Sequence, residues 1–471
     1  MNKKCQVFTP ENYVRELLDS VGYTRQLYGN RILENSCGDG NILVAVVQRY
    51  IDDCVRSGLS RTRIKNGLSR DIYGVEIDKE QYEKCIENLN NVLKRNNIGL
   101  VKWKIFNADY LRWNAPCDFQ YIIGNPPYIT YSELKEKERQ YVKSTFQTCV
   151  KGKFDYCYAF IEKSINLLAR DGKMSYLIPS SIFKTVFGLN LRNFMRPYIT
   201  TIKDYTQEKV FDNALVKSAI MVLDMQRRDD VLHYTDVTMQ TQLDIPIEQL
   251  TDKWFFTANL ANGLHKFGDY FKISHVVATL LNEAYVIGEE DYEETEQGFL
   301  CKGHNIEREM VRDTATPRSL RYDKVEKIIF PYRYQNAQLV RFKTGEFEES
   351  YPETAAYLND FRTALDNRKS DKSAKWYEYG RSQALSGLDR EKLLISTVIT
   401  ENVPVYRLGR DCIPYAGMYI VACEDNDEYT LEDAVQILTS RDFRQYVLDV
   451  GIHISGSSLR ITSKDVEEYR F

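Results

Sequence analysis

The sequence lacks the cysteine and histidine patterns that are typical of a structural zinc site. Its ten cysteines include no CxxC pair, and its five histidines form no cluster beside them. Zinc ligands usually recur at such short spacings. We therefore expect no metal site and interpret the cysteines as reduced, mostly packed thiols.

Long apolar runs are also absent. No run approaches the length of a membrane span, and the two lysines near the N-terminus are not followed by the apolar stretch of a secretory signal. We expect a cytoplasmic protein of a bacterial or archaeal cell, with no membrane partner.

An overall excess of positive charge is missing as well. The formal net charge is -4, whereas a nucleic-acid binder usually has an electropositive footprint. A nucleic-acid partner would therefore need a locally basic surface. Residues 361–410 hold ten Lys/Arg against six Asp/Glu, and acid gathers in EEDYEETE at 289–296. Ordinary solvated surface explains either segment alone about equally well.

The first half of the chain alternates predicted strands and helices. Strands are predicted at 31–35, 71–77, 101–106, 119–123, 174–178 and 217–224. Helical apolar spacing lies between them, most clearly from Tyr82 to Leu93. Alternation of this kind predicts an α/β domain with a parallel, doubly wound sheet.

The second half loses this alternation. Short strands such as KIIFPY, KLLISTV and GMYIVAC mix with helical stretches at 353–368 and 431–438. The 471 residues are too many for one ordinary core. We predict two domains, 1–240 and 241–471, of which the second has a mixed α+β fold.

Three loops after predicted strands have residues suited to a nucleoside ligand. Gly38 and Gly40 form a tight strand-to-helix turn that lets the backbone approach a ligand. Glu76 ends the next strand, where a carboxylate can accept both hydroxyls of a ribose. Asp109 could accept from an adenine amino group while Tyr110 packs on the ring. Helix capping is the alternative interpretation of both carboxylates.

The sequence YIIGNPPY at 121–128 gives the most specific signal. Pro126 and Pro127 remove backbone donors and stiffen the loop, so that the Asn125 side-chain oxygen and the Pro126 carbonyl can both accept from one NH2 group. Two such acceptors favour an aromatic amine whose lone pair leaves the ring plane and attacks a sulfonium methyl. Tyr128 supplies a flat face for the target base. A simple turn is the alternative.

Taken in order, VFTP (7–10), ENSCGDG (34–40), YGVEID (73–78), NADYL (107–111) and GNPPY (124–128) resemble the N6-adenine DNA methyltransferases of restriction-modification systems, in their gamma order. The resemblance covers about the first 225 residues. It implies a Rossmann-like S-adenosylmethionine-binding domain, base flipping and a C-terminal target-recognition domain. Asn35 and Asp39 depart from the family's cofactor motif, which has proline and a small hydroxyl residue there.

The resemblance also implies roles for individual residues. The implied catalytic residues are Asn125, Pro126, Pro127, Tyr128 and Phe211, of which Phe211 would stack on the flipped adenine opposite Tyr128. The implied cofactor-binding residues are Thr9, Pro10, Glu34, Ser36, Gly38, Gly40, Glu76, Ile77, Asp109, Tyr110, Asn125 and Phe160.

A loop in the C-terminal half, near WYEYGRSQ at 376–383, loosely resembles the recognition domains of the same family. Its candidate DNA-binding residues are Lys369, Lys372, Lys375, Trp376, Tyr377, Tyr379 and Arg381. A solvated, partly packed surface explains the same residues equally well.

Together these features predict a site-specific, monomeric adenine-N6 methyltransferase that acts on double-stranded DNA. It would belong to a restriction-modification or orphan methylation system. A cognate endonuclease would be encoded separately, because VFTP begins at residue 7 and the rest of the chain has no convincing nuclease motif. The alternatives are methylation of a protein glutamine or of RNA adenine by the same NPPY chemistry, and a non-catalytic DNA-recognition protein.

Overall fold

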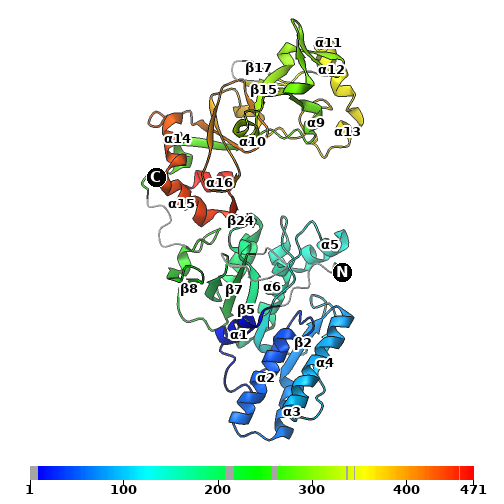
Figure 1. The fold of residues 1–471 in the computed structure, drawn as a ribbon, viewed down its shortest axis with the longest axis vertical. Helices are drawn as coiled ribbons and strands as arrows, with labels where there is room; N and C mark the ends of the chain where they lie inside the picture. Colours follow the sequence, from blue (N-terminus) through cyan, green and yellow to red (C-terminus); the bar gives the residue numbers. More distant parts are fainter. Residues whose placement is uncertain (1–8, 207–216, 257–262, 336–337, 344, 456) are drawn as a thin grey trace. The chain divides into compact units, whose positions relative to one another are not determined.

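The computed structural model describes residues 9–206, 217–256, 263–335, 338–343, 345–455 and 457–471 (Figure 1). The chain divides into two compact units, Met1–Ala258 and Asn259–Phe471. The predicted boundary at 240–241 falls in the turn of a hairpin that belongs to the sheet of the first unit.

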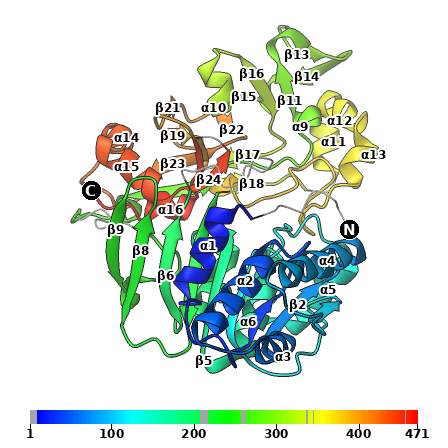
Figure 2. The ribbon, with the colours of Figure 1, turned by 60° about the horizontal axis from the view of Figure 1, so that its bottom comes forward.

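The first unit is built on a nine-stranded sheet with the order β3-β2-β1-β4-β5-β7-β6-β8-β9. Its strands are β1 (Ile32–Glu34), β2 (Ile72–Glu76), β3 (Lys104–Asn107), β4 (Phe119–Gly124), β5 (Leu168–Pro179), β6 (Ile199–Asp204), β7 (Ser218–Asp224), β8 (Val231–Asp236) and β9 (Thr241–Pro246). The first five strands in this order are parallel. Figure 2 shows β8 and β9 at the edge of the sheet away from α3 and α4.

Helices cover both faces of this sheet. They are α1 (Glu11–Ser20), α2 (Asn41–Arg56), α3 (Arg61–Asp71), α4 (Lys79–Arg95), α5 (Glu136–Thr145), α6 (Cys157–Leu167) and α7 (Leu189–Met195). Neighbouring strand residues point to opposite faces, so Ile32 packs in the core with α1, α2 and α4, while Leu33 packs in the core with α5, α6 and α7. The doubly wound arrangement predicted from the sequence is confirmed, but the sheet is mixed, not wholly parallel, because β7, predicted at 217–224, runs antiparallel to β5 and β6.

The second unit has several small sheets. Its strands are β10 (Phe271–His275), β11 (Val286–Gly288), β12 (Glu293–Glu294), β13 (Gly298–Cys301), β14 (His304–Glu307), β15 (Val311–Ala315), β16 (Glu326–Ile329), β17 (Arg333–Gln335), β18 (Gln338–Val340), β19 (Lys392–Ile395), β20 (Val398–Ile399), β21 (Val405–Leu408), β22 (Ile413–Pro414), β23 (Met418–Ala422), β24 (Ile452–Ser455) and β25 (Ser458–Arg460). Two four-stranded sheets, β10-β23-β19-β21 and β11-β16-β15-β22, are the largest.

The helices of the second unit are short. They are α8 (Phe267–Tyr270), α9 (Asn282–Tyr285), α10 (Pro317–Arg321), α11 (Glu346–Ser350), α12 (Pro352–Asn359), α13 (Arg362–Asp366), α14 (Leu431–Thr439), α15 (Arg441–Val450) and α16 (Ser463–Glu467). The helix predicted at 353–368 is wrong as one element, because it is interrupted at Asp360 and Phe361, where the Asp360 carboxylate pairs with His304 at 3.0 Å. The mixed α+β character is as predicted.

Within the parts of the chain that the structure describes, no helix has both the length and the apolar character needed to cross a membrane. The nine described cysteines are free thiols, and six of them are buried, as the sequence predicts.

Candidate active site

The loops that follow β1, β2, β3 and β4 lie at one edge of the sheet, because the carboxyl ends of parallel strands share an edge. The strand order reverses between β1 and β4, and such a switch point is where open α/β sheets bind ligands. The four sequence motifs with polar or glycine residues therefore surround one crevice.

The turn between β1 and α2 contains two glycines that are needed for different structural reasons. Gly38 and Gly40 both have positive φ, +52° and +87°. A Cβ at Gly40 would lie 2.7 Å from the Cys85 sulfur, so this glycine lets α2 approach α4. A Cβ at Gly38 would meet nothing within 4 Å. The backbone at Gly38 thus borders open space in which a ligand can lie.

Glu76 connects the glycine turn with the end of β2. Its Oε2 accepts from the Gly38 amide at 2.9 Å, and its Oε1 accepts from the Asp78 amide at 2.7 Å. Asp78, and not Glu76, caps α4. Burial raises the pKa of Glu76. Each carboxylate oxygen keeps a second lone pair for a ligand hydroxyl. The neighbouring Ile77 is 45% exposed, which leaves an apolar surface beside this carboxylate.

Glu34 ends β1 beneath the glycine turn and is 2% exposed. No hydrogen-bond partner among the described residues reaches its buried Oε2, and burial raises the pKa of this carboxyl well above its ordinary range. An unpaired buried carboxylate oxygen is costly. In the ligand-free site burial favours the neutral acid, whereas a positively charged ligand group nearby would stabilise the carboxylate, so Glu34 and the open space at Gly38 fit a cationic nucleoside such as S-adenosylmethionine.

Asn125 lies directly after β4 and is held from two sides. Its Nδ2 donates to Thr9 Oγ1 at 3.3 Å, and its main-chain oxygen accepts from Ser36 Oγ at 3.1 Å. The Thr9 carbonyl in turn accepts from Asn41 on α2. Because Nδ2 only donates, Oδ1 is the side-chain atom of Asn125 that can accept a hydrogen bond from a ligand. Thr9 and Ser36 therefore set the orientation that the amine-methylating hypothesis needs.

Tyr128 is fixed by its hydroxyl, which donates to the Leu177 carbonyl of β5 at 2.9 Å. Burial raises the pKa of Tyr128 well above its ordinary value, so the phenol stays protonated. The side chain is half-buried, and Pro126 is buried beneath the loop. Phe211, the predicted partner of Tyr128, lies outside the described residues.

Asp109 and Tyr110 are less open than the sequence suggested. The Asp109 carboxylate pairs with Arg112, which also binds Glu138 at 2.9 Å. Tyr110 is 2% exposed, and its ring packs 5.2 Å from that of Phe160. Tyr110 and Phe160 therefore form a buried wall of the crevice, and Tyr110 does not present an exposed face to a ligand ring.

A buried polar network lies behind this wall, and it explains Asn35. The Asn35 Nδ2 donates to Ser164 Oγ at 3.1 Å and to the Tyr176 hydroxyl. Ser164 Oγ also lies 2.8 Å from the Tyr110 hydroxyl and 2.7 Å from that of Tyr176. The asparagine that departs from the family motif thus links β1 with α6, β5 and the loop after β3.

Lys163 on α6 also binds the loop after β3. Its Nζ donates to the carbonyls of Tyr110 at 2.6 Å, Leu111 at 3.1 Å and Trp113 at 2.6 Å. Burial lowers the pKa of Lys163 to about 8, partly opposed by Asp109. Sequence reasoning missed Lys163, Ser164 and Tyr176. The only available signal was polar side chains inside an otherwise apolar helix and strand.

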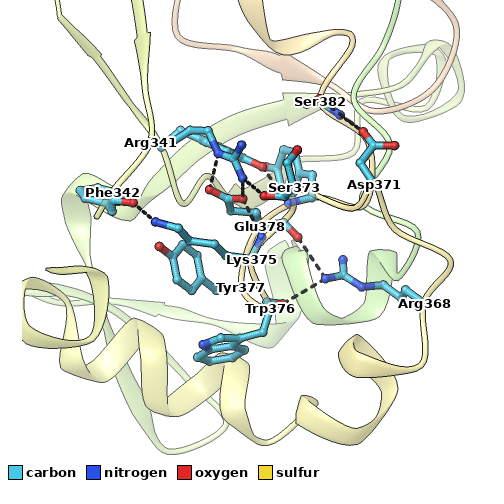
Figure 3. Close-up of polar contacts among 12 residues, drawn as sticks. Arg341, Phe342, Arg368, Asp371, Ser373, Lys375, Trp376, Tyr377, Glu378 and Ser382 are labelled. Carbon is cyan, nitrogen blue, oxygen red and sulfur yellow. Dashed lines mark hydrogen bonds and ion pairs between the residues drawn. The ribbon is translucent and has the colours of Figure 1, made fainter. Parts of the chain in front are cut away.

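The candidate DNA-binding loop of the second unit is mostly packed inward (Figure 3). Tyr377 and Tyr379 are each 1% exposed. The Tyr377 ring stacks 4.0 Å from Phe347, and the Tyr379 hydroxyl donates to the Ile329 carbonyl at 2.7 Å. As placed, these two rings are core residues and offer no face to a base.

The polar members of this loop also have internal partners. Lys375 donates through Nζ to the Phe342 carbonyl, Trp376 donates to Glu348 at 3.0 Å, and Arg381 donates to Asp371 at 2.7 Å. Figure 3 shows the buried Glu378 at the centre, where it accepts from the Arg341 side chain. Of the predicted set, Lys369 and Lys372 are the exposed residues. Of the two interpretations of this loop, a partly packed surface therefore agrees with the observed contacts better than a DNA-facing loop does.

Among the residues with described positions, no group of His, Cys, Asp and Glu could hold a metal ion.

Comparison with known proteins relates the chain to restriction-modification methylases. Residues 50–211 match the family described as Eco57I restriction-modification methylase. The chain is 24% identical over 539 residues to the type II restriction enzyme and methyltransferase RM.Eco57I of Escherichia coli, with 92% of this chain and 53% of the relative covered. It is 31% identical over 185 residues to the type II methyltransferase M.TthHB8I of Thermus thermophilus, with 37% and 35% covered. The chain thus spans about half of RM.Eco57I.

Two solved structures share the fold over nearly the whole chain. The type IIL restriction-modification enzyme MmeI in complex with DNA has a TM-score of 0.63 at 14% identity, with 99% of this chain and 69% of that chain covered. A nuclease-deletion mutant of the type ISP enzyme LlaGI, with a DNA substrate mimic, has a TM-score of 0.57 at 13% identity, with 98% and 46% covered. The predicted fold class, an α/β domain with a doubly wound sheet followed by a mixed α+β region, is confirmed.

Proposed function

The chain is related to the DNA methyltransferases of restriction-modification systems, and from this premise we propose that it methylates N6 of an adenine extruded from duplex DNA. The observation that carries the proposal is the orientation of Asn125, whose Nδ2 is bound to Thr9 and whose main chain is bound to Ser36. This arrangement leaves the side-chain oxygen to accept from a planar amine.

S-adenosylmethionine is the proposed donor, and when bound it supplies an electrophilic sulfonium methyl group. Glu34 lies where an ammonium or sulfonium charge would satisfy its unpaired oxygen, Gly38 borders the open space, and Glu76 offers acceptors to a ribose. The residues proposed to complete the pocket are Thr9, Pro10, Ser36, Gly40, Ile77, Asp109, Tyr110 and Phe160. No metal is needed for this transfer.

The chain's own residues prepare the amine. Asn125 Oδ1 and the Pro126 carbonyl accept its two hydrogens, which favours a nitrogen lone pair directed out of the ring plane. Tyr128, anchored on Leu177, supports one face of the base. Phe211 is proposed for the other face. Because the amine loses its proton during or after attack, no strong general base is required.

The proposed sequence-reading region is 241–471, with Lys369 and Lys372 as its exposed candidates for phosphate contacts. We further propose that the chain acts as a monomer within a restriction-modification or orphan methylation system. EC 2.1.1.72 is the corresponding activity.

We expect Asn125→Ala to abolish methyl transfer, because it removes one of the two acceptors, while cofactor binding survives. Transfer of labelled methyl groups to DNA measures the first effect, and calorimetry with S-adenosylmethionine measures the second. Asn193→Ala, at an exposed position on α7, is the control and should behave as wild type. Full activity of Asn125→Ala would sink the mechanism.

The acceptor substrate is tested by offering labelled cofactor with DNA, RNA or a translation release factor. Labelling of RNA or of the protein in place of DNA would favour the corresponding alternative, since each also presents a planar NH2 group. No cofactor binding under any condition would favour a non-catalytic DNA-recognition protein.

A further inference from the structure

A solvent-exposed apolar pair stands in the turn after β5. Val186 is 61% exposed and Phe187 is 44% exposed, in the short 3-10 helix Val186–Gly188. The Phe187 ring lies directly over Gly152, where a Cβ would overlap it, and Gly152 has φ +74°. Val150, 48% exposed, extends the surface. A ring supported on one face by backbone and open on the other is a preformed apolar contact surface.

This surface borders the proposed catalytic loop on two sides. Asp155, three residues after Gly152, pairs with Thr130, two residues after Tyr128, in an antiparallel bridge. The Tyr156 amide also donates to the Ile129 carbonyl at 2.9 Å. On the other side, the turn with Phe187 follows β5, the strand whose Leu177 carbonyl anchors Tyr128. The apolar pair therefore belongs to the same edge of the sheet as the NPPY loop.

Positively charged side chains lie beside Gly152, the residue that supports the Phe187 ring. Lys151 and Lys153 flank Gly152 and are exposed. Two carboxylates of the neighbouring segments are oriented by backbone amides: Glu133 accepts from the Thr130 amide at 2.9 Å, and Asp155 accepts from the Cys157 amide at 3.1 Å. Lysines beside an exposed aromatic ring match a partner with phosphates next to stacked bases. A purely apolar protein partner would gain nothing from the two lysines beside the ring.

We propose that Lys151, Lys153, Val186 and Phe187 form a DNA-contacting surface beside the extruded adenine. The lysines contact phosphates, and the Phe187 ring packs on the base stack at the gap that the adenine leaves. This inference rests on the proposed function and adds a contact within the first unit, whereas the sequence placed the DNA-binding residues in the second. By occupying the gap, Phe187 stabilises the extruded state.

The test compares two duplexes that contain the target site, which is first mapped by sequencing modified bases in the DNA of expressing cells. In one duplex the target adenine is paired, and in the other its partner is an abasic position. Phe187→Ala should lower the methylation rate on paired DNA by about tenfold, the order expected for one lost base–aromatic contact. The loss should be much smaller on the abasic duplex, where extrusion costs less.

Leu100→Ala is the matched control. Leu100 is 70% exposed and precedes β3, so it lies toward the opposite edge of the sheet, and its loss should change neither rate.

Lys151→Ala combined with Lys153→Ala should weaken DNA binding and reduce the slope of its salt dependence by about two.

Wild-type rates for Phe187→Ala on paired DNA would overturn the proposal. An equal loss on both duplexes would also overturn it, because a general defect of the site does not depend on the cost of extrusion. If the wild-type protein methylates neither duplex but labels RNA or protein, the proposed function itself has failed.

Discussion

Tyr110 shows how single side chains shape the proposed cofactor crevice. Helix α6 holds it by three different contacts: Lys163 binds its carbonyl, Ser164 binds its hydroxyl, and Phe160 packs on its ring. Burial leaves the Tyr110 hydroxyl protonated by raising its pKa. The loop after β3 therefore depends on α6 for its position, and residues that touch no ligand set the shape of the wall.

We expect Lys163→Met to raise the dissociation constant for S-adenosylmethionine by about tenfold, because three carbonyls lose the charged donor that positions the loop after β3. A tenfold change corresponds to about 1.4 kcal/mol, less than the contribution of a single hydrogen bond to a charged group, since only part of the lost loop stability is expected to reach the ligand. Calorimetry at pH 7 measures the change.

Lys392→Met provides the control in the second unit. Lys392 also donates to three carbonyls, and burial also lowers its pKa to about 8, but it lies outside the proposed crevice. Equal cofactor affinity for Lys163→Met and wild type would show that the lysine does not position the loop.

At the scale of elements, the parallel strands bring distant loops together and the connections between them set their distance. Glu76 ties the end of β2 to the glycine turn, and Ser36 ties that turn to the loop after β4. Gly40 allows α2 to begin at once after the turn and to approach α4 closely. The crevice is therefore formed by the close packing of elements as well as by its own polar residues.

We expect Gly40→Ala to destabilise the protein more than Gly58→Ala. Both positions have positive φ, which costs a non-glycine residue about 1–2 kcal/mol. Only at Gly40 does the added Cβ crowd Cys85, which should cost about 1–3 kcal/mol more. Denaturant unfolding of the two variants gives the difference, and equal losses would contradict the close α2–α4 approach.

At the scale of the whole molecule, each unit has its own hydrophobic core. One large cluster of the second unit is centred on residues such as Tyr285, Tyr332, Tyr377 and Tyr379, whereas the clusters of the first unit lie on the two faces of its sheet. Separate cores indicate that the stability of one unit can change without altering the ligand site of the other.

Tyr377→Ala should lower the free energy of unfolding of the second unit by about 3–5 kcal/mol, the usual cost of emptying a buried aromatic site. Hydrogen exchange resolved along the chain would show faster exchange in 259–471, while cofactor binding by the first unit stays unchanged. The exposed Tyr322, replaced by alanine, is the control. Unchanged exchange in Tyr377→Ala would contradict the burial of this ring.

Much of the first unit could be predicted from the sequence because its signals are local. Apolar periodicity predicted the alternation of strands and helices, and glycine and proline placed the turns at Gly38 and Pro126. The parallel order then implied that Glu34, Glu76 and Asn125 share an edge, since this follows from topology alone.

What the sequence by itself determined was the type of fold, the edge that carries the site and the chemistry suggested by NPPY. Only the tertiary structure decided which polar side chains are free to act. In the folded chain Asp109 forms an ion pair with Arg112, and Tyr377 and Tyr379 are buried. Lys163 and Asn35 hold neighbouring elements by hydrogen bonds, whereas Phe187 remains exposed. The reason is physical: backbone preference and periodicity act between near neighbours, whereas burial and pairing depend on contacts between residues far apart in the chain.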